Sequence, residues 1–332
     1  MTWAIYVMLG TQMWEWEKDN GKRISFDDEA WKIIVAEAHK NGLDTIVLDL
    51  GEGVRYGSHP ELARPGAWSR ERVREEVKAL KAMGITLIPK MNFSATHHFW
   101  LGEYAKMMST APYYRVCRDL IYEVYTLFDK PPYIHLGMDE EDEVFCVRNN
   151  TGLVSMRRGE LFWHDLQFLC DCVRDTGATP WIFADHCLKL PDEFRRHIMP
   201  EDILLTPGHY LAVKKEHYTL IEDSPMYKAH YSQEPYVHMK LKYVEDDPYF
   251  VRFMQQAVPA ARDGYDLMPV LSTYNKCEYN TDDHVEYFRD NAPAERLKGF
   301  LTAPWLTTEM ENVAEIVRNM ELLKAAREKY YG

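Results

Sequence analysis

Two adjacent carboxylic acids, Asp139 and Glu140, directly follow a short apolar run at residues 133–138. A carboxylic acid can donate a proton near neutral pH when crowding and partial burial raise its pKa. Neighbouring side chains on an extended segment point in opposite directions, so these acids do not serve one water molecule as an acid and base pair. We expect one to reach a scissile oxygen while the other orients the substrate. The alternative is that the acidic run at residues 139–143 is a solvated turn, but its position after an apolar run favours a site.

Eight short apolar runs are spread along the chain, and amphipathic stretches separate them. Continuous apolarity is typical of parallel strands that are covered on both faces. The runs begin at residues 4, 45, 86, 133, 179, 203, 267 and 299. Helical spacing predicts helices at residues 26–40, 69–83, 113–128, 161–176, 248–262 and 312–329, with Ser69 as an N-cap. This alternation predicts an α/β fold, a single (β/α)₈ TIM barrel that forms one catalytic-type domain over residues 1–332.

One stretch, residues 214–247, does not follow this alternation, since it carries Pro225, Pro235 and several Tyr and His residues. It is too long for an ordinary loop between a strand and a helix. We therefore expect an irregular insertion that shapes the mouth of the barrel.

In a barrel of this kind, catalytic side chains follow the carboxyl ends of the strands. The polar and aromatic residues at these positions are, in chain order, Gln12, Trp14, Glu15, Trp16, Glu52, Arg55, Asn92, His97, His98, Asp139, Glu140, Glu141, Asp142, Asp185, His186, His209, Tyr210, Tyr274, Asn275, Glu278, Trp305 and Glu309. Carboxylates, histidines and tryptophans that converge on one mouth are typical of a carbohydrate site. A phosphate site would instead require Gly-rich turns with Lys or Arg, which do not follow these runs.

The charge balance argues against a nucleic-acid partner, because 52 acidic residues outnumber 39 basic ones and the formal net charge is -13. A protein that binds a duplex needs a basic face to neutralise phosphates. Motifs for a dinucleotide, a P-loop or a metal are lacking, so we expect no cofactor and no metal. The six cysteines fit no metal spacing and are expected to be reduced and mostly buried. Without an apparent signal peptide or apolar span, we expect a cytoplasmic protein with no membrane partner.

The order of these motifs resembles the catalytic barrel of the family 20 glycoside hydrolases, the β-N-acetylhexosaminidases and their relatives. Residues 135–140, His-Leu-Gly-Met-Asp-Glu, are similar to the family signature His-x-Gly-Gly-Asp-Glu, with Met138 at the second Gly. Residues 51–62 resemble the loop after the second strand of the family. Residues 84–98 resemble its Gly-Ile-x-x-Ile-Pro-Glu-x-Asp-x-Pro-Gly-His stretch, although Lys90 and Asn92 replace its two acids. The resemblance extends over residues 1–320 and is most specific at 45–140.

The resemblance implies roles for individual residues. Glu140 would protonate the glycosidic oxygen, and Asp139 would orient a 2-acetamido group whose carbonyl oxygen attacks the anomeric carbon. Tyr274, or alternatively Tyr210, would donate a hydrogen bond to that oxygen. The remaining residues implied in substrate binding or in tuning the acid are Glu52, Arg55, His97, His98, Trp181, Asp185, Trp305 and Glu309. The implied partner is a carbohydrate that ends in a β-linked N-acetylhexosamine.

Two other functions stay open. A retaining glycosidase could use Glu140 as the acid and Glu278 or Glu309 as its nucleophile, with carboxyl groups about 5–5.5 Å apart. A sugar-binding barrel without activity would also account for the replacements at Lys90 and Asn92. Some single residues have equally plain structural interpretations, since Trp181 and Trp305 would suit a barrel core and Tyr274 would suit a core or rim. The sequence does not predict the oligomeric state.

Overall fold

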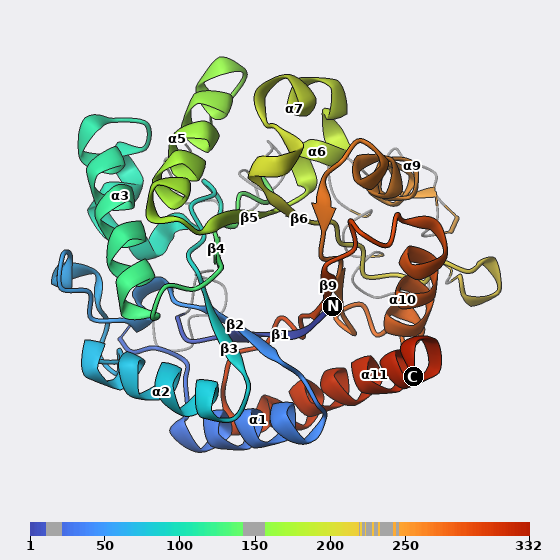
Figure 1. Cartoon of the computed structure of the whole chain (residues 1–332), viewed down its shortest axis with the longest axis horizontal. Coiled ribbons are helices and arrows are strands. Elements are labelled where there is room, and N and C mark those ends of the chain that lie inside the picture. The colour runs from blue at the N-terminus through green and yellow to red at the C-terminus, as the bar shows by residue number, and fades with distance from the viewer. Residues whose placement is uncertain are drawn as a thin grey trace.

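The computed structural model describes residues 1–10, 22–141, 157–218 and 246–332, together with 220, 223, 228, 232, 242 and 243. In this part of the chain, strand segments form one parallel sheet that curves into a ring, and helices surround it (Figure 1). The strands are β1 (Thr2–Met8), β2 (Thr45–Asp49), β3 (Thr86–Lys90), β4 (Tyr133–His135), β5 (Thr179–Phe183), β6 (Leu204–Thr206), β7 (Asp266–Leu267), β8 (Val270–Leu271) and β9 (Gly299–Thr302). Every predicted apolar run thus contains a strand.

The ring closes through β7 and β8, which are two parts of the seventh predicted run. β7 pairs with β6, whereas β8 pairs with β9, and β9 in turn pairs with β1. Pro269 lies between the two parts, where it has no N–H to donate to the sheet. The backbone N–H of Val270 donates to Pro207 O at 3.0 Å and so continues the contact with the β6 side. The predicted (β/α)₈ barrel is confirmed.

Helices cover the outside of the sheet and include all six that the sequence predicts. They are α1 (Asp28–Lys40), α2 (Arg70–Ala82), α3 (Ala111–Leu127), α5 (Glu160–Thr176), α6 (Asp185–Lys189), α7 (Pro191–His197), α9 (Pro248–Arg262), α10 (Asn280–Asn291) and α11 (Val313–Tyr331). The short 3₁₀ helices are η2 (Gly51–Gly53), η3 (Pro60–Leu62), η4 (His98–Met107), η5 (Pro200–Asp202), η6 (Lys215–His217) and η10 (Met310–Asn312). Ser69 caps α2 as predicted, since its side chain accepts a hydrogen bond from the Arg72 N–H at 3.2 Å. The sequence did not predict α6, α7 or α10.

The core has two layers because successive residues of a strand face opposite sides of the sheet. Along β1, Ala4, Tyr6 and Met8 belong to the cluster that fills the barrel, whereas Ile5 and Val7 pack in the layer beneath the helices. The barrel cluster also contains Val47, Ile88, Trp181, Phe183, Leu204, Met268, Val270, Leu301 and Ala303, with Tyr133, Tyr210 and Trp305 packed against it. Apolar side chains therefore fill the interior of the barrel.

The state of the cysteines agrees with the prediction from the sequence. Five cysteines lie in the described part of the chain, and all five are buried free thiols, as predicted. Cys146 lies outside it.

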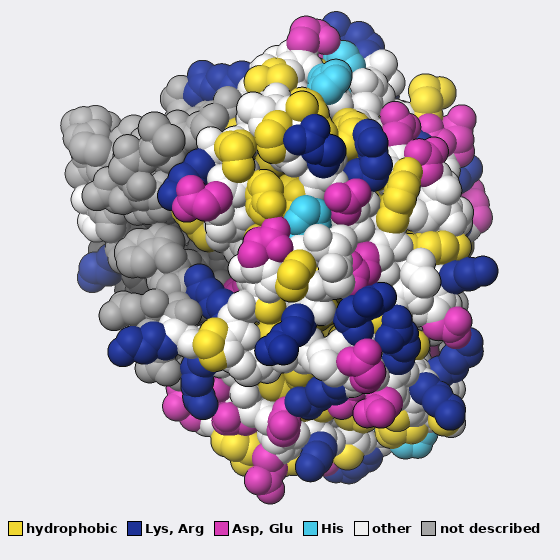
Figure 2. All heavy atoms as spheres, turned by 90° about the vertical axis from the view of Figure 1, so that its left-hand side faces the viewer, with side chains coloured by type: hydrophobic (Ala, Val, Ile, Leu, Met, Phe, Trp, Pro, Cys, Tyr) yellow, Lys and Arg dark blue, Asp and Glu magenta, His cyan; other side chains and the backbone are white. Residues whose placement is uncertain are grey.

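On the side of the molecule shown in Figure 2, Lys and Arg side chains are interspersed with Asp and Glu. No helix among the described residues is long and apolar enough to span a membrane. The predicted insertion at 214–247 lies largely outside the described residues, although η6 falls at its start.

His284, on α10, is a buried titratable group in the helical layer. Its ring stacks on Phe253 with centroids 5.3 Å apart, and the residue is fully buried. Burial lowers the pKa of His284 from 6.5 to about 3, and a backbone contact with Leu211 opposes this shift. The unfolded chain therefore binds a proton at this position below about pH 6.5, whereas the folded chain does so only near pH 3.

Acid should therefore destabilise the fold through His284. Between pH 7 and pH 5, this group lowers the free energy of unfolding by about 2 kcal/mol, because only the unfolded state gains the proton. We expect His284→Gln to reduce the acid-dependent loss by that amount, measured by urea unfolding at both pH values. His39→Gln, which changes an exposed histidine on α1, serves as the control and should retain the full loss. Equal losses in wild type and His284→Gln would contradict this assignment.

Candidate functional site

The segment after β4 turns sharply through residues with left-handed backbone conformations. Gly137 has φ 74°, Met138 has φ 68° and Glu140 has φ 54°. A Cβ atom at position 137 would overlap the carboxamide of Asn92, so glycine is required there by space as well as by conformation. Left-handed conformations at non-glycine residues concentrate at functional sites, where the surroundings hold them in place. This turn presents Asp139 and Glu140 at the carboxyl end of the barrel.

Asn92, which follows β3, holds one oxygen of Asp139. Its Nδ2 donates to Asp139 Oδ1 at 2.8 Å, and its own Oδ1 accepts a hydrogen bond from the Ser94 N–H at 3.1 Å. The contact with Ser94 identifies the amide oxygen, because only an acceptor suits a backbone N–H. Asn92 therefore presents its donor to Asp139 and restrains the position of that carboxylate oxygen. The sequence singled out Asn92 as a departure from the family pattern and did not indicate this contact.

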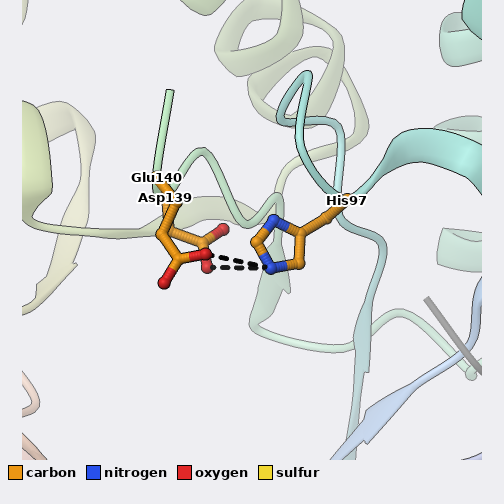
Figure 3. A group of neighbouring side chains, drawn as sticks. All are labelled: His97, Asp139 and Glu140. Carbon is orange, nitrogen blue, oxygen red and sulfur yellow. Dashed lines mark ion pairs between the residues drawn. The ribbon is translucent and has the colours of Figure 1, made fainter. Parts of the chain in front are cut away.

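His97 faces both acids from the loop after β3 (Figure 3). Its Nε2 lies 3.9 Å from Asp139 Oδ2 and 3.6 Å from Glu140 Oε2. On the other side of the ring, Nδ1 lies 2.7 Å from Thr96 Oγ1 and 3.1 Å from Ser94 Oγ. Burial lowers the pKa of His97, while the Asp139 carboxylate opposes that shift and Lys90 adds to it. The structure thus brings together His97, Asp139 and Glu140, three of the residues that the sequence predicts.

An aromatic group lies beside the two acids. Trp305 packs against Tyr6, with ring centroids 4.7 Å apart, and against Tyr210 at 6.0 Å, and Tyr210 also contacts the ring of Tyr274 at 6.2 Å. Burial raises the pKa of Tyr210 well above 10, and the charges of Asp185, Glu140 and Asp139 raise it further. Tyr210 therefore stays protonated as a hydrogen-bond donor near the carboxylates. Tyr274 is 41% exposed, at the outer end of the group.

A buried ion pair lies at the base of the site, at the ends of β2 and β3. Lys90 Nζ lies 2.5 Å from Asp49 Oδ2, and the hydroxyl of Tyr6 donates to the same oxygen. Both charged side chains are almost completely buried. Burial raises the pKa of Asp49, while the charge of Lys90 and the hydrogen bonds from Lys90 and Tyr6 oppose that shift. Lys90 thus replaces an acid of the family pattern and pairs with an acid on the neighbouring strand.

Arg157 links the turn after β4 to the surrounding helices. Its guanidinium is fully buried and forms an ion pair with Glu141. The same group lies 3.5 Å from Asp165 Oδ2 on α5 and donates a hydrogen bond to Phe93 O at 2.7 Å. The backbone N–H of Ala95 also donates to Glu141, at 2.8 Å. One cation therefore joins the segments after β3 and β4 to α5. The sequence did not indicate this role of Arg157, because no local pattern marks an arginine whose partners lie on three other segments.

The structure places some of the other predicted residues in packed surroundings. Trp181 is completely buried inside the barrel, and its indole N–H donates to Thr206 Oγ1 at 2.5 Å, as expected of a core residue. His98 is buried against the ring of Tyr113, and burial lowers the pKa of His98 to about 3, with smaller contributions from Arg157 and His97. Glu52 is buried in η2, 3.6 Å from Arg64 Nη1.

Other predicted residues lie nearer the surface. Arg55 is exposed, and Asp185 is partly buried at the start of α6, where its charge acts on Tyr210. Glu309 is partly buried and accepts a hydrogen bond from Thr307 Oγ1 at 2.6 Å. Glu278 is 70% exposed and pairs with Arg318 on α11, an environment that does not suit a buried nucleophile. The candidates outside the described residues are Gln12, Trp14, Glu15, Trp16 and Asp142.

The described residues contain one group of three ligand-type side chains whose polar atoms lie within 4.8 Å of one another: His97, Asp139 and Glu140. Chemically, the arrangement offers a carboxylate fixed by Asn92, a more exposed carboxylic acid, an imidazole next to both, and aromatic rings at the side. These are the components of a site that binds a polar ring with an apolar face and transfers a proton to it.

Fold and site together define an α/β barrel with an acidic centre at the carboxyl ends of its strands. The sequence matches no protein-family model and no curated protein sequence. Among solved structures, the chain is similar to a β-N-acetylhexosaminidase from Bacteroides fragilis, with a TM-score of 0.62 and 14% identity. The match covers 98% of this chain and 65% of that one, so this chain spans slightly less than two thirds of that enzyme.

Two further solved structures share this fold. One is the pneumococcal virulence factor StrH, whose structure was studied for N-glycan recognition and hydrolysis. It matches with a TM-score of 0.59 and 14% identity, and the match covers 99% of this chain and 85% of that one. A family 20 exo-β-N-acetylglucosaminidase from Vibrio harveyi, in complex with N-acetylglucosamine, has a TM-score of 0.57 at 14% identity, covering 97% and 54%. The resemblance to the barrel of family 20 is thereby confirmed for the fold.

The buried ion pairs of Arg157 with Glu141 and Asp165 predict that replacing Arg157 lowers the free energy of unfolding much more than replacing the exposed Arg318. Arg157→Met leaves Glu141 and Asp165 buried without their cation and should lower the free energy of unfolding by about 3–5 kcal/mol. Arg318→Met, which breaks the exposed pair with Glu278, should change it by about 1 kcal/mol or less. Urea unfolding of both variants measures the contrast. Similar losses in the two variants would show that Arg157 does not hold the network.

Proposed function

We propose that this protein is a glycoside hydrolase that removes terminal β-linked N-acetylhexosamine by a substrate-assisted, retaining mechanism. The observation that carries the proposal is the convergence of Asp139, Glu140 and His97 at the end of β4, beside the rings of Tyr210 and Trp305. The similarity of the barrel to hexosaminidases supports the same class. In this mechanism the substrate's own acetamido oxygen replaces an enzyme nucleophile.

Asp139 is assigned to the acetamido group. Asn92 engages its Oδ1, so Oδ2 remains on the side of His97 and can accept a hydrogen bond from the acetamido N–H. A carboxylate at this position stabilises the positive charge that develops when the acetamido oxygen attacks the anomeric carbon. A fixed carboxylate supplies this stabilisation without reorganising during the reaction. Tyr210 or Tyr274 is assigned as the donor to the acetamido oxygen.

Glu140 is assigned as the general acid. It is the more exposed of the two carboxyl groups, with 31% of its side chain accessible against 17% for Asp139, which suits contact with a leaving group that departs into solvent. Its proton goes to the glycosidic oxygen as that bond breaks. In the second step Glu140 takes a proton from the water that opens the cyclic intermediate. His97, next to Glu140, is assigned a positioning role.

The proposal predicts selective turnover. The whole chain should release aryl alcohol from aryl β-glycosides of N-acetylglucosamine or N-acetylgalactosamine, but not from those of glucose or galactose. Glu140→Gln should lower kcat/KM for the acetamido substrate by about 10²–10⁴-fold, because proton transfer to the leaving group is lost. Asp139→Asn should lower it by about 10²–10³-fold. Glu103→Gln, at an exposed position in η4 paired with Lys106, is the control and should retain full activity.

Three outcomes would contradict the proposal in different ways. Turnover of glucosides or galactosides that Glu309→Gln abolishes would indicate an enzyme nucleophile. Calorimetric binding of a sugar without turnover of any aryl glycoside would indicate a binding barrel. A kcat/KM in Glu140→Gln equal to that of the wild type would exclude Glu140 as the acid.

A further inference from the structure

The group formed by His97, Asp139 and Glu140 has a spacing that suits a shared ion better than a direct contact. The Nε2 atom of His97 lies 3.6 Å and 3.9 Å from the nearest carboxylate oxygens, which is beyond hydrogen-bond distance. Ligands bound to one zinc ion at about 2.0–2.2 Å in tetrahedral geometry lie roughly 3.3–3.6 Å from one another. The two distances from Nε2 therefore match or exceed this separation by only a few tenths of an ångström, and the ligand atoms of all three residues lie within 4.8 Å of one another.

The imidazole is held in an orientation that presents Nε2 to the two acids (Figure 3). His97 is only 7% exposed, and its Nδ1 lies within hydrogen-bond distance of the hydroxyls of Thr96 and Ser94. Metal-binding histidines commonly use their second nitrogen in this way, which fixes the ring and leaves the other nitrogen to the ion. A neutral ring that donates from Nδ1 to Thr96 presents a lone pair on Nε2.

The carboxylates are also prepared for a cation. Asn92 engages Oδ1 of Asp139, which leaves Oδ2 on the side of His97. Asp139 and Glu140 keep 17% and 31% of their side chains exposed, so an ion from solution can reach them. The nearby cation of Lys90 is paired with Asp49 at 2.5 Å. A divalent ion between His97 and the two acids would add positive charge next to both carboxylates.

We propose that His97, Asp139 and Glu140 bind one divalent transition-metal ion of the zinc class, with a fourth position open to water. One imidazole and two carboxylates suit zinc, whereas Ca²⁺ and Mg²⁺ prefer oxygen ligands alone. Because the same acids carry the proposed glycosidase chemistry, the bound ion also inhibits turnover reversibly. The inhibition rests on the proposed function, but the binding does not.

A second histidine provides a matched comparison within the same chain. His59 also lies between two acids, but its Nδ1 is 3.0 Å from Glu61 and its Nε2 is 3.2 Å from Asp119. Each ring nitrogen therefore makes its own hydrogen bond, and the two carboxylates do not converge on one atom. His59→Gln should accordingly leave metal binding unchanged.

The test is calorimetric titration of the whole chain, first treated with a chelator, with ZnCl₂ in a buffer that does not coordinate zinc. We expect one site in the wild type, an affinity at least about tenfold lower in His97→Gln and in Glu140→Gln, and no change in His59→Gln. MgCl₂ should produce no binding heat. Zinc should also raise the melting temperature of the wild type more than that of Glu140→Gln. Glu140→Gln conserves side-chain volume and controls for a misfolded His97→Gln.

Each outcome separates this proposal from the proposed function. Unchanged zinc affinity in both His97→Gln and Glu140→Gln, or no zinc binding in the wild type, would overturn the metal site even if the enzyme cleaves N-acetylhexosaminides. Zinc binding that these variants lose would support it even if no glycoside is cleaved. With an active enzyme, zinc should inhibit, a chelator should restore turnover, and inhibition that survives in His59→Gln would support the assignment.

Discussion

The left-handed backbone at Gly137, Met138 and Glu140 is the constraint on which the site depends, because it determines where both carboxylates lie. Such conformations cost a non-glycine residue about 1–2 kcal/mol each, so contacts from outside the turn must maintain them. Asn92 supplies one contact from the β3 side, by packing on Gly137 and donating to Asp139. The buried pair of Glu141 with Arg157 supplies the other, at the end of the turn. The site is thus held between two neighbouring segments and α5.

Met138 illustrates how a departure from a family pattern is accommodated. The pattern has glycine here, and the observed φ of 68° gives the physical reason, since glycine adopts this conformation without steric cost. Methionine is strained in this backbone conformation. Its residue is only 1% exposed, however, and its sulfur lies 4.0 Å from Nη2 of Arg157. Burial of a methionine side chain contributes about 1.5–3 kcal/mol, enough to offset the backbone strain.

The barrel could be predicted because continuous apolar runs and helical stripes are local properties of the sequence. The helix α10 could not, because the first half of its buried face is polar: Asn280 donates to His209 O and Leu211 O, and Asp283 accepts from the backbone at Val213 and Lys214. Tertiary hydrogen bonds take the place of apolar packing in that half of the helix. In the site, strand-end positions identified His97, Asp139 and Glu140, whereas the placement of Trp181 inside the barrel depends on which face of β5 is inward.

The replacements at Lys90 and Asn92 are understood only together with their partners. The family pattern has two acids at these positions, whereas this chain has one cation, Lys90, and one neutral group, Asn92. When all groups are ionised, the local charge is therefore higher by three. Lys90 does not face Asp139 and Glu140 as a bare cation, because Asp49 pairs with it and Tyr6 donates to the same Asp49 oxygen. Asn92 gives Asp139 a donor where a second carboxylate would repel it. Asp139 and Glu140 therefore remain the acids that face His97, and both the proposed sugar substrate and the proposed metal ion would contact the carboxylate oxygens on that side.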